Sequence, residues 1–130
     1  LKITSDDKSN GGGIYAVKGM TVINSTFSQN KNRYDGGAIY SLEEVNIQNS
    51  TFSGNAASGV GNGGAIFSKG GVNIHKSSFS DNTVLGAGSG GAISSLGGDV
   101  SVTESTFTNN QARMNGGAIY AEGRNTVTGS

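Results

Sequence analysis

The sequence predicts an all-β protein, a right-handed single-stranded parallel β-helix of about five coils of roughly 26 residues, with three short strands in each coil. Three observations predict it. A glycine-rich step leads into an isoleucine five times, with separations of 25, 27, 27 and 26 residues between isoleucines. A tetrapeptide from Phe to Asn recurs in step with it, and short apolar/polar alternations lie between the two motifs. A fixed period of this length indicates stacked repeats.

Each repeat offers three strand candidates, and the second coil shows them in order. Residues 38–41 follow the glycine step, residues 45–48 alternate apolar and polar side chains, and residues 50–53 lead into the Phe-to-Asn motif. Alternation with period two is typical of a strand. The corners are too short for consecutive strands to pair as hairpins, so we expect each strand to pair with its equivalent one coil away, in a right-handed sense.

By the same alternation Ile39, Val45, Ile47 and Phe52 point inward with their counterparts in the other coils. The predicted ladders contain Ile14, Ile39, Ile66, Ile93 and Ile119, and Phe27, Phe52, Phe79 and Phe107. Burying four such side chains contributes about 6–12 kcal/mol per coil, whereas ordering the backbone costs about 1–2 kcal/mol per residue. A coil therefore depends on its neighbours.

Two further features recur at the corners, an asparagine and a glycine pair. The asparagines that end the Phe-to-Asn motif are expected to face inward and to bond turn backbone and the amides of adjacent coils; they are Asn30, Asn55, Asn82 and Asn110. The glycine pair is expected to supply a positive φ, or a corner where a Cβ would clash. Both features therefore predict structural roles.

Composition narrows the function classes. The 130 residues include 23 Gly, no Pro and no Cys, with nine Lys and Arg against nine Asp and Glu. No basic run supports nucleic-acid binding, no apolar stretch is long enough to insert into a membrane, and no disulfide can form. We expect residues 1–130 to form one β-helix domain that is a segment of a longer chain.

No catalytic or metal-binding pattern is visible in the sequence. Pectate-lyase-like enzymes need several carboxylates converging on Ca²⁺ and a basic proton abstractor. Here the aspartates lie at different offsets in the repeat, and His75 stands alone at an outward strand position. We therefore predict no enzyme activity, no catalytic residues, no metal and no cofactor.

The segments between the Asn corner and the next glycine pair vary in length, which predicts a recognition surface along one edge of the rod. They span residues 31–35, 56–62, 83–89 and 111–115. The candidate recognition residues are Arg33, Tyr34, Asp35, Arg113 and Met114. Arginine, tyrosine and methionine are enriched in protein contacts.

Outward positions in the strands form columns of their own. Aromatic side chains follow most of the repeat isoleucines, at Tyr15, Tyr40, Phe67 and Tyr120, and Ser94 interrupts them. They are expected to stack, and to stabilise a sheet face. Lys76 and Glu104 occupy equivalent corner positions, where opposite charges neutralise each other with little effect on stability.

The paired motifs Gly-Gly-Ala-Ile and Phe-x-x-Asn resemble the repeats of the chlamydial polymorphic outer membrane proteins and of adhesin-like proteins similar to them. The resemblance covers essentially the whole chain. It departs at Ile3 and Asp6, which replace Phe and Asn, at Ser94, and in the missing cysteines. It implies a β-helical autotransporter passenger, extracellular or at the cell surface and attached through segments that this chain does not contain. Its partner would be a protein or glycan on a host or neighbouring cell.

Three functional hypotheses follow. The first is a non-enzymatic adhesin or passenger segment that displays recognition loops. The second is a structural protein that forms extracellular filaments, in which the open β-helix ends self-associate. The third is part of a carbohydrate-active β-helix enzyme whose catalytic coils lie outside this segment.

Overall fold

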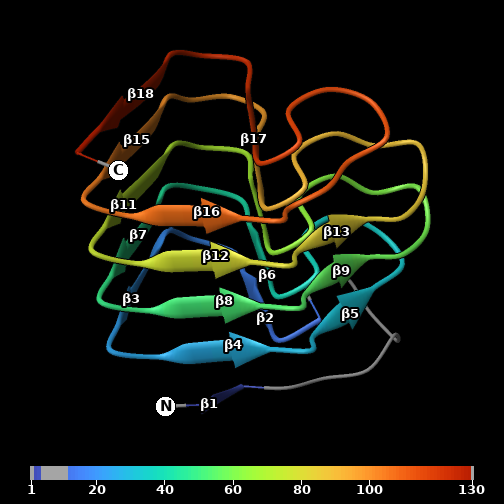
Figure 1. Cartoon of the computed structure of the whole chain (residues 1–130), viewed down its shortest axis with the longest axis horizontal. Coiled ribbons are helices and arrows are strands. Elements are labelled where there is room, and N and C mark those ends of the chain that lie inside the picture. The colour runs from blue at the N-terminus through green and yellow to red at the C-terminus, as the bar shows by residue number, and fades with distance from the viewer. Residues whose placement is uncertain (1, 4–11, 130) are drawn as a thin grey trace.

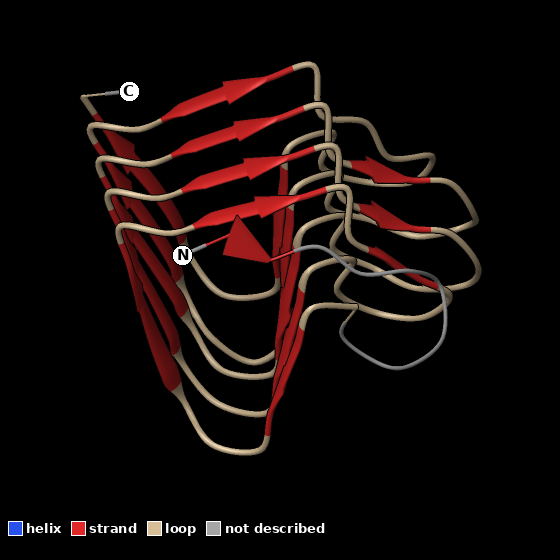
Figure 2. Ribbon diagram, turned by 90° about the horizontal axis from the view of Figure 1, so that it is seen from below, coloured by secondary structure: helices blue, strands red, loops and turns tan. Residues whose placement is uncertain are grey.

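The computed structural model describes residues 2–3 and 12–129, and side chains from residue 12 onward; Asp6, in the first copy of the repeat, lies outside these residues. The described chain winds into a parallel β-helix with three long walls (Figures 1 and 2). Each wall holds five strands, so the chain completes about four turns between the first and last strand of a wall. The predicted fold class is confirmed.

Wall A contains the phenylalanines of the Phe-to-Asn motif. Its strands are β1 (Lys2–Ile3), β4 (Thr26–Ser28), β8 (Thr51–Ser53), β12 (Ser78–Ser80) and β16 (Thr106–Thr108). They pair in parallel, each with its equivalent in the next coil, and Ile3 takes the register position of Phe27. The replacement of Phe by Ile in the first copy therefore leaves the pairing intact.

Wall B begins at the repeat isoleucines. Its strands are β2 (Ile14–Ala16), β6 (Ile39–Ser41), β10 (Ile66–Ser68), β14 (Ile93–Ser95) and β17 (Ile119–Ala121). Wall C follows with β3 (Met20–Ile23), β7 (Val45–Gln48), β11 (Val72–His75), β15 (Val100–Thr103) and β18 (Asn125–Thr128). Both are parallel throughout, with the repeat positions in register.

A fourth, shorter sheet was not predicted. It contains β5 (Lys31–Asn32), β9 (Ala56–Ala57) and β13 (Thr83–Val84), which lie in the segments expected to be loops. These pairs share no side-chain type and only two residues each, so no periodicity marks them. Thr83 also forms an isolated parallel bridge with Gln111 of the next coil.

The core consists of stacked side chains, as expected, with phenylalanines in wall A, isoleucines in wall B and mixed aliphatic residues in wall C. Phe27, Phe52, Phe79 and Phe107 stack with centroids 4.6, 4.7 and 4.9 Å apart and rings within 4° of parallel. Ile39, Ile66 and Ile93 are fully buried, and Ile14 and Ile119 are partly buried at the two ends. The spacing of the rings matches that between neighbouring strands, about 4.8 Å, so each coil buries its side chains against the next.

Hydrogen-bonded ladders run through two corners. Asn30 donates from its backbone N–H and from Nδ2 to Asn55 Oδ1, both at 3.0 Å, and Asn55 and Asn82 repeat the pattern one coil further. Asn55 Nδ2 also donates to the Phe27 carbonyl at 3.0 Å. This confirms the predicted asparagine ladder. A serine ladder, which we did not predict, links Ser25, Ser50, Ser77 and Ser105 through backbone N–H to Oγ bonds of 3.0–3.1 Å.

The residue that precedes each serine and each asparagine of these two ladders has a left-handed backbone conformation. Before the serines stand Asn24, Asn49, Lys76 and Glu104, with φ between 47° and 51°. Before the asparagines stand Gln29, Gly54, Asp81 and Asn109, with φ between 55° and 65°. A single left-handed residue turns the chain sharply at each corner. Lys and Glu are strained there, whereas Asn and Gly are well suited.

The glycine pair has both of its expected roles, a positive φ and a corner where a Cβ would clash. Its first member has φ between 63° and 74° in the four later coils. A Cβ on the second member would lie about 2 Å from a carbonyl oxygen of the next coil, as at Gly37 and Gly64. The glycine pair therefore lets the backbones of adjacent coils approach closely at the entry to wall B.

Candidate functional site

The four variable loops stack into one projection, here called the loop lobe, comprising residues 31–35, 56–62, 83–89 and 111–115. It extends from the corner between walls A and B (Figure 2). Backbone bonds join consecutive loops: Ser58 N–H donates to the Asn32 carbonyl at 2.7 Å, and Met114 N–H donates to the Gly88 carbonyl at 3.1 Å. The expectation that the loops emerge on one edge is confirmed.

A polar ladder ties the base of the lobe together at the residue before each glycine pair. Asn62 donates to Asp35 Oδ1 from its backbone N–H at 2.7 Å and from Nδ2 at 3.3 Å. Ser89 N–H donates to Asn62 Oδ1 at 2.8 Å, and Asn115 N–H donates to Ser89 Oγ at 3.1 Å. Asp35, a predicted recognition residue, thus has a structural role. The signal was in the sequence, because a polar residue precedes every one of these pairs.

Glycines in the middle loops permit this stacking. A Cβ on Gly61 would lie 1.9 Å from the Tyr34 carbonyl oxygen, and a Cβ on Gly88 would lie 2.1 Å from that of Gly61. Buried Ala57 and Val84 pack inside the lobe. The glycine-rich composition of loops 56–62 and 83–89 therefore reflects close backbone contact between coils.

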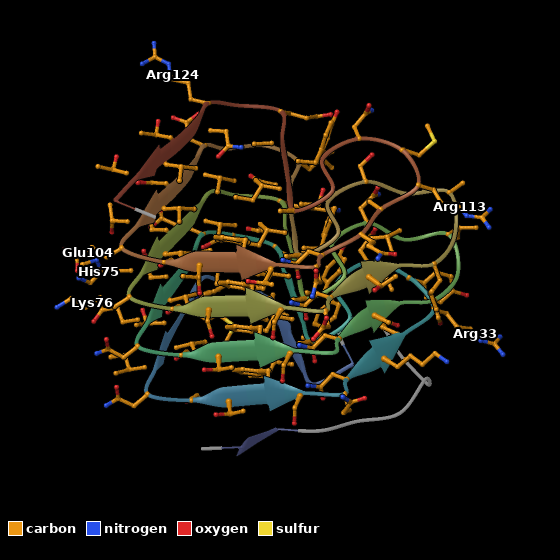
Figure 3. All side chains as sticks on the ribbon, viewed as in Figure 1. Arg33, His75, Lys76, Glu104, Arg113 and Arg124 are labelled. Atoms are coloured by element: carbon orange, nitrogen blue, oxygen red, sulfur yellow. The ribbon has the colours of Figure 1, made fainter. Side chains whose placement is uncertain are left out.

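The outer rim of the lobe displays one large apolar side chain from each loop. The exposed fractions are 51% for Tyr34, 76% for Val60, 49% for Leu85 and 62% for Met114. Arg33 and Arg113 are also exposed, and both project from the lobe edge (Figure 3). The structure thus brings four of the predicted recognition residues to one edge. Sequence reasoning missed Val60 and Leu85, although both are apolar residues in the variable loops that fit none of the three predicted strand columns.

Charge is unevenly distributed between the lobe and the rest of the chain. The lobe has three cationic residues, Lys31, Arg33 and Arg113, and one carboxylate, Asp35, hence a formal charge of +2. The other described side chains comprise four cations and six carboxylates, hence −2. Neither lobe arginine has a hydrogen bond or ion pair to another described residue. The neutral net charge of the chain therefore conceals a cationic lobe.

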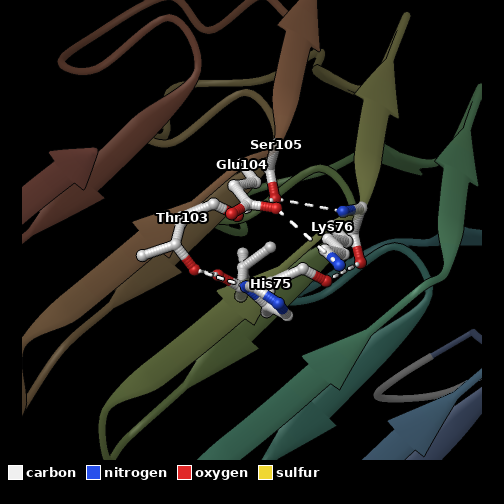
Figure 4. A network of polar contacts seen from close by, with 7 residues as sticks. His75, Lys76, Thr103, Glu104 and Ser105 are labelled. Atoms are coloured by element: carbon white, nitrogen blue, oxygen red, sulfur yellow. Dashed lines mark hydrogen bonds and ion pairs between the residues drawn. The ribbon is translucent and has the colours of Figure 1, made fainter. Parts of the chain in front are cut away.

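A second polar surface lies on the outer face of wall C. A hollow of about 130 Å³ there is lined by strands β7, β11 and β15, including Asn46, Gln48, Asn73, His75 and Thr103. Asn73 Nδ2 donates to Asn46 Oδ1 at 2.9 Å, and His75 Nδ1 lies 2.7 Å from Thr103 Oγ1 (Figure 4). His75 points outward, as predicted.

Thr103 Oγ1 has a second partner, because it also donates to the Ile74 carbonyl at 3.3 Å. Which atom donates in the contact with His75 Nδ1 depends on the imidazole tautomer. The predicted neutralising pair is also present, with Lys76 Nζ 3.9 Å from Glu104 Oε2 and both side chains more than half exposed, so it contributes little to stability.

The outward aromatic column is only partly accessible. Tyr15 stacks on Tyr40 with centroids 5.1 Å apart, and Tyr40 on Phe67 at 5.3 Å. The stacking agrees with the prediction. However, Phe67 is only 3% exposed and Ser94, the next position along, is buried. The column therefore stabilises wall B and does not offer a continuous aromatic surface.

Candidate chemistry elsewhere in the described part of the chain is sparse. Within residues 2–3 and 12–129, no group of three or more His, Cys, Asp or Glu side chains could hold a metal ion. The same residues contain no helix with the length and apolar character needed to cross a membrane. The candidate functional surface is the loop lobe, where exposed arginine, aromatic and aliphatic side chains come from four stacked loops.

Comparison with known proteins agrees with the fold. No curated protein and no solved structure gives a significant match to the chain. A family model described as a right handed beta helix region matches residues 2–130. The handedness expected from the crossover rule agrees with that description. The chain belongs to the family of right-handed β-helix regions.

Proposed function

We propose that this chain is a non-enzymatic recognition segment of a secreted or cell-surface protein, in which the β-helix is a rigid rod and the loop lobe binds a partner. The observation that carries the proposal is the lobe rim, where arginine, aromatic and aliphatic side chains from four loops lie exposed on one edge. Arginine and tyrosine are enriched among the residues that contribute most to protein contact energies, and methionine is enriched at interfaces. Large apolar side chains exposed together are typical of interaction sites.

The construction of the lobe supports recognition as its task. Its loops are joined by backbone bonds and by the ladder from Asp35 to Asn115. The rim side chains are therefore presented by an ordered backbone, and less entropy is lost on binding. Functional residues on loops that a rigid scaffold positions are a common arrangement.

The resemblance to polymorphic outer membrane protein repeats supports the setting. It suggests an adhesin or autotransporter passenger that is held at the cell surface through segments outside this chain. The partner is then a protein or glycan on a host or neighbouring cell. Family membership describes the fold and does not specify an activity.

The test is adhesion of protein-coated fluorescent beads to cultured epithelial cells. The variant Tyr34→Ser with Met114→Ser removes two exposed rim side chains and should reduce bead attachment at least severalfold. The matched control, Val17→Ser with Leu96→Ser, removes two exposed apolar side chains from the corner between walls B and C. Equal adhesion by both variants, or no adhesion by the unmodified protein, would contradict the proposal.

A second candidate is supported by the last described coil. Phe107, Ile119 and Val127 line a hollow of about 450 Å³ there, beside strands β16, β17 and β18, which pair on one side only within the described residues. Unpaired strand edges next to apolar side chains favour addition of another parallel coil. A second copy supplying that coil would produce the filament of the structural hypothesis.

Filament formation is tested by electron microscopy and sedimentation over a range of protein concentrations. The filament hypothesis predicts particles that lengthen by whole multiples of one block. Val127→Glu, which places a charge in the hollow, should stop the growth. Particles of constant length at all concentrations would exclude filaments of this kind.

A further inference from the structure

The loop lobe combines cationic and apolar side chains in a fixed order along the helix axis. Arg33 and Tyr34 lie in the first loop and Arg113 and Met114 in the fourth, with Val60 and Leu85 in the two loops between them. Both arginines therefore flank an apolar centre. The only carboxylate of the lobe, Asp35, already accepts two hydrogen bonds from Asn62.

We propose that the lobe rim binds an extended acidic segment of another protein, with two carboxylates that flank an apolar side chain. This inference rests on the proposed recognition function and names the chemistry of its partner. The formal charge of +2 on the lobe, opposed by −2 on the other described side chains, favours and orients an anionic partner. Planar guanidinium groups bind carboxylates through paired hydrogen bonds.

The spacing of the coils specifies the partner further. Arg33 and Arg113 stand three coils apart, which corresponds to about 14 Å at a strand spacing of about 4.8 Å. An extended chain rises about 3.4 Å per residue, so side chains at positions i and i+4 lie about 14 Å apart on the same face. The residue at i+2 shares that face and meets Val60 and Leu85. The recognised pattern is therefore an acidic residue, an apolar residue two positions later and a second acidic residue two positions after that.

The probe is a fluorescein-labelled peptide, Ser-Glu-Thr-Leu-Thr-Glu-Ser, titrated with the protein in low-salt buffer and followed by fluorescence anisotropy. We expect saturable binding that weakens as salt is added. Two control peptides are used. The spacing control has the same composition as the probe but places the two Glu residues next to each other, and the second control keeps the charge but replaces Leu by Ser. Both should bind several times more weakly than the probe.

Protein variants test the arginines directly. Arg33→Gln and Arg113→Gln should each weaken binding about two- to fivefold, as expected for exposed ion pairs, and the double variant should lose more than either. Arg124→Gln is the matched control, since Arg124 is an exposed arginine located away from the lobe (Figure 3). It should leave the affinity unchanged. Circular dichroism checks that each variant is folded.

Three results would overturn the acidic-segment proposal: no binding of the probe at the highest protein concentration, equal binding of the probe and its spacing control, or equal losses in Arg33→Gln and Arg124→Gln. The bead assay separates this failure from that of the broader function. If adhesion still depends on Tyr34 and Met114 while the probe does not bind, recognition by the lobe stands and its partner has another chemistry.

Discussion

The three walls and the loop lobe belong to the same coils, yet they are stabilised differently. In the walls, inward apolar side chains stack in register around a buried core, as the phenylalanines do at 4.6–4.9 Å. In the lobe, backbone contacts and a short polar ladder hold the loops while the large side chains point outward. The walls therefore constrain the inward positions to apolar side chains of suitable size. The lobe constrains mainly its glycines and its ladder, which leaves the rim residues available for recognition.

The largest expected difference between the two regions comes from apolar truncation. Phe79 is fully buried between Phe52 and Phe107, so Phe79→Ala should lower the free energy of unfolding by about 3–5 kcal/mol. Leu85→Ala on the exposed lobe rim should change it by less than about 0.5 kcal/mol. Urea unfolding followed by circular dichroism measures both. Similar losses in the two variants would mean that the lobe contributes to the core.

Matched glycine substitutions sharpen the comparison. A Cβ on Gly64, at the entry to wall B, would lie 2.0 Å from the Gly91 carbonyl oxygen, and one on Gly61, in the lobe, 1.9 Å from that of Tyr34. We expect Gly64→Ala to cost about 3 kcal/mol, because the adjacent coil is fixed by its neighbours. Gly61→Ala should cost less, about 1–2 kcal/mol. The atoms that its Cβ would meet are also backbone, of Tyr34 and Asp35, but the lobe loops are held by fewer strand pairs than the wall coils are.

Hydrogen exchange locates the two effects. Gly64→Ala should raise amide exchange rates in walls A and B, whereas Gly61→Ala should raise them only within the lobe. Faster exchange throughout the walls in Gly61→Ala would show that the lobe and the coils unfold as one unit.

The asparagine ladder of the walls and the polar ladder at the base of the lobe provide a third test. Asn55 is fully buried and bonds Asn30, Phe27 and Asn82, so Asn55→Ala should cost about 2–3 kcal/mol by leaving buried polar groups without partners. Asn62→Ala in the lobe should cost about 1 kcal/mol, because Asn62 is only partly buried and water can replace its bonds. Thermal unfolding of both variants compares them, and a greater loss for Asn62→Ala would reverse the proposed ranking.

The smallest expected effect is a gain in stability. Lys76 has φ of 47°, a left-handed conformation that suits Asn better than Lys. Lys76→Asn should raise the free energy of unfolding by about 0.5 kcal/mol, since the exposed pair with Glu104 that it removes contributes little. Asn49, at the equivalent corner with φ of 49°, supplies the reverse control. Asn49→Lys should destabilise the protein by a similar amount, and a loss in both variants would show that the ion pair outweighs the backbone strain.

Much of the fold could be predicted because a solenoid repeats the same residue types at equivalent positions of successive coils. The inward positions of Ile39, Val45, Ile47 and Phe52 follow from alternation alone, and all four are buried. The asparagine ladder followed from the recurrence of one amide at one corner. Four recognition candidates reached the same edge because their loops share one position in the repeat. In contrast, the serine ladder and the two-residue strands were not predicted, because Ser is common at surface positions and two residues carry no period.

The sequence by itself therefore determined the walls, their period and the side chains that fill the core, because each depends on residue type repeated at a fixed interval. Only the tertiary structure decided how the loops stack, which placed Asp35 in a ladder and left Val60 and Leu85 exposed on the same lobe as Arg33 and Arg113. Loops of five and seven residues cannot be aligned by period. Their register is set by the approach of glycine backbones in neighbouring coils, a contact between residues about 26 positions apart that no local pattern encodes.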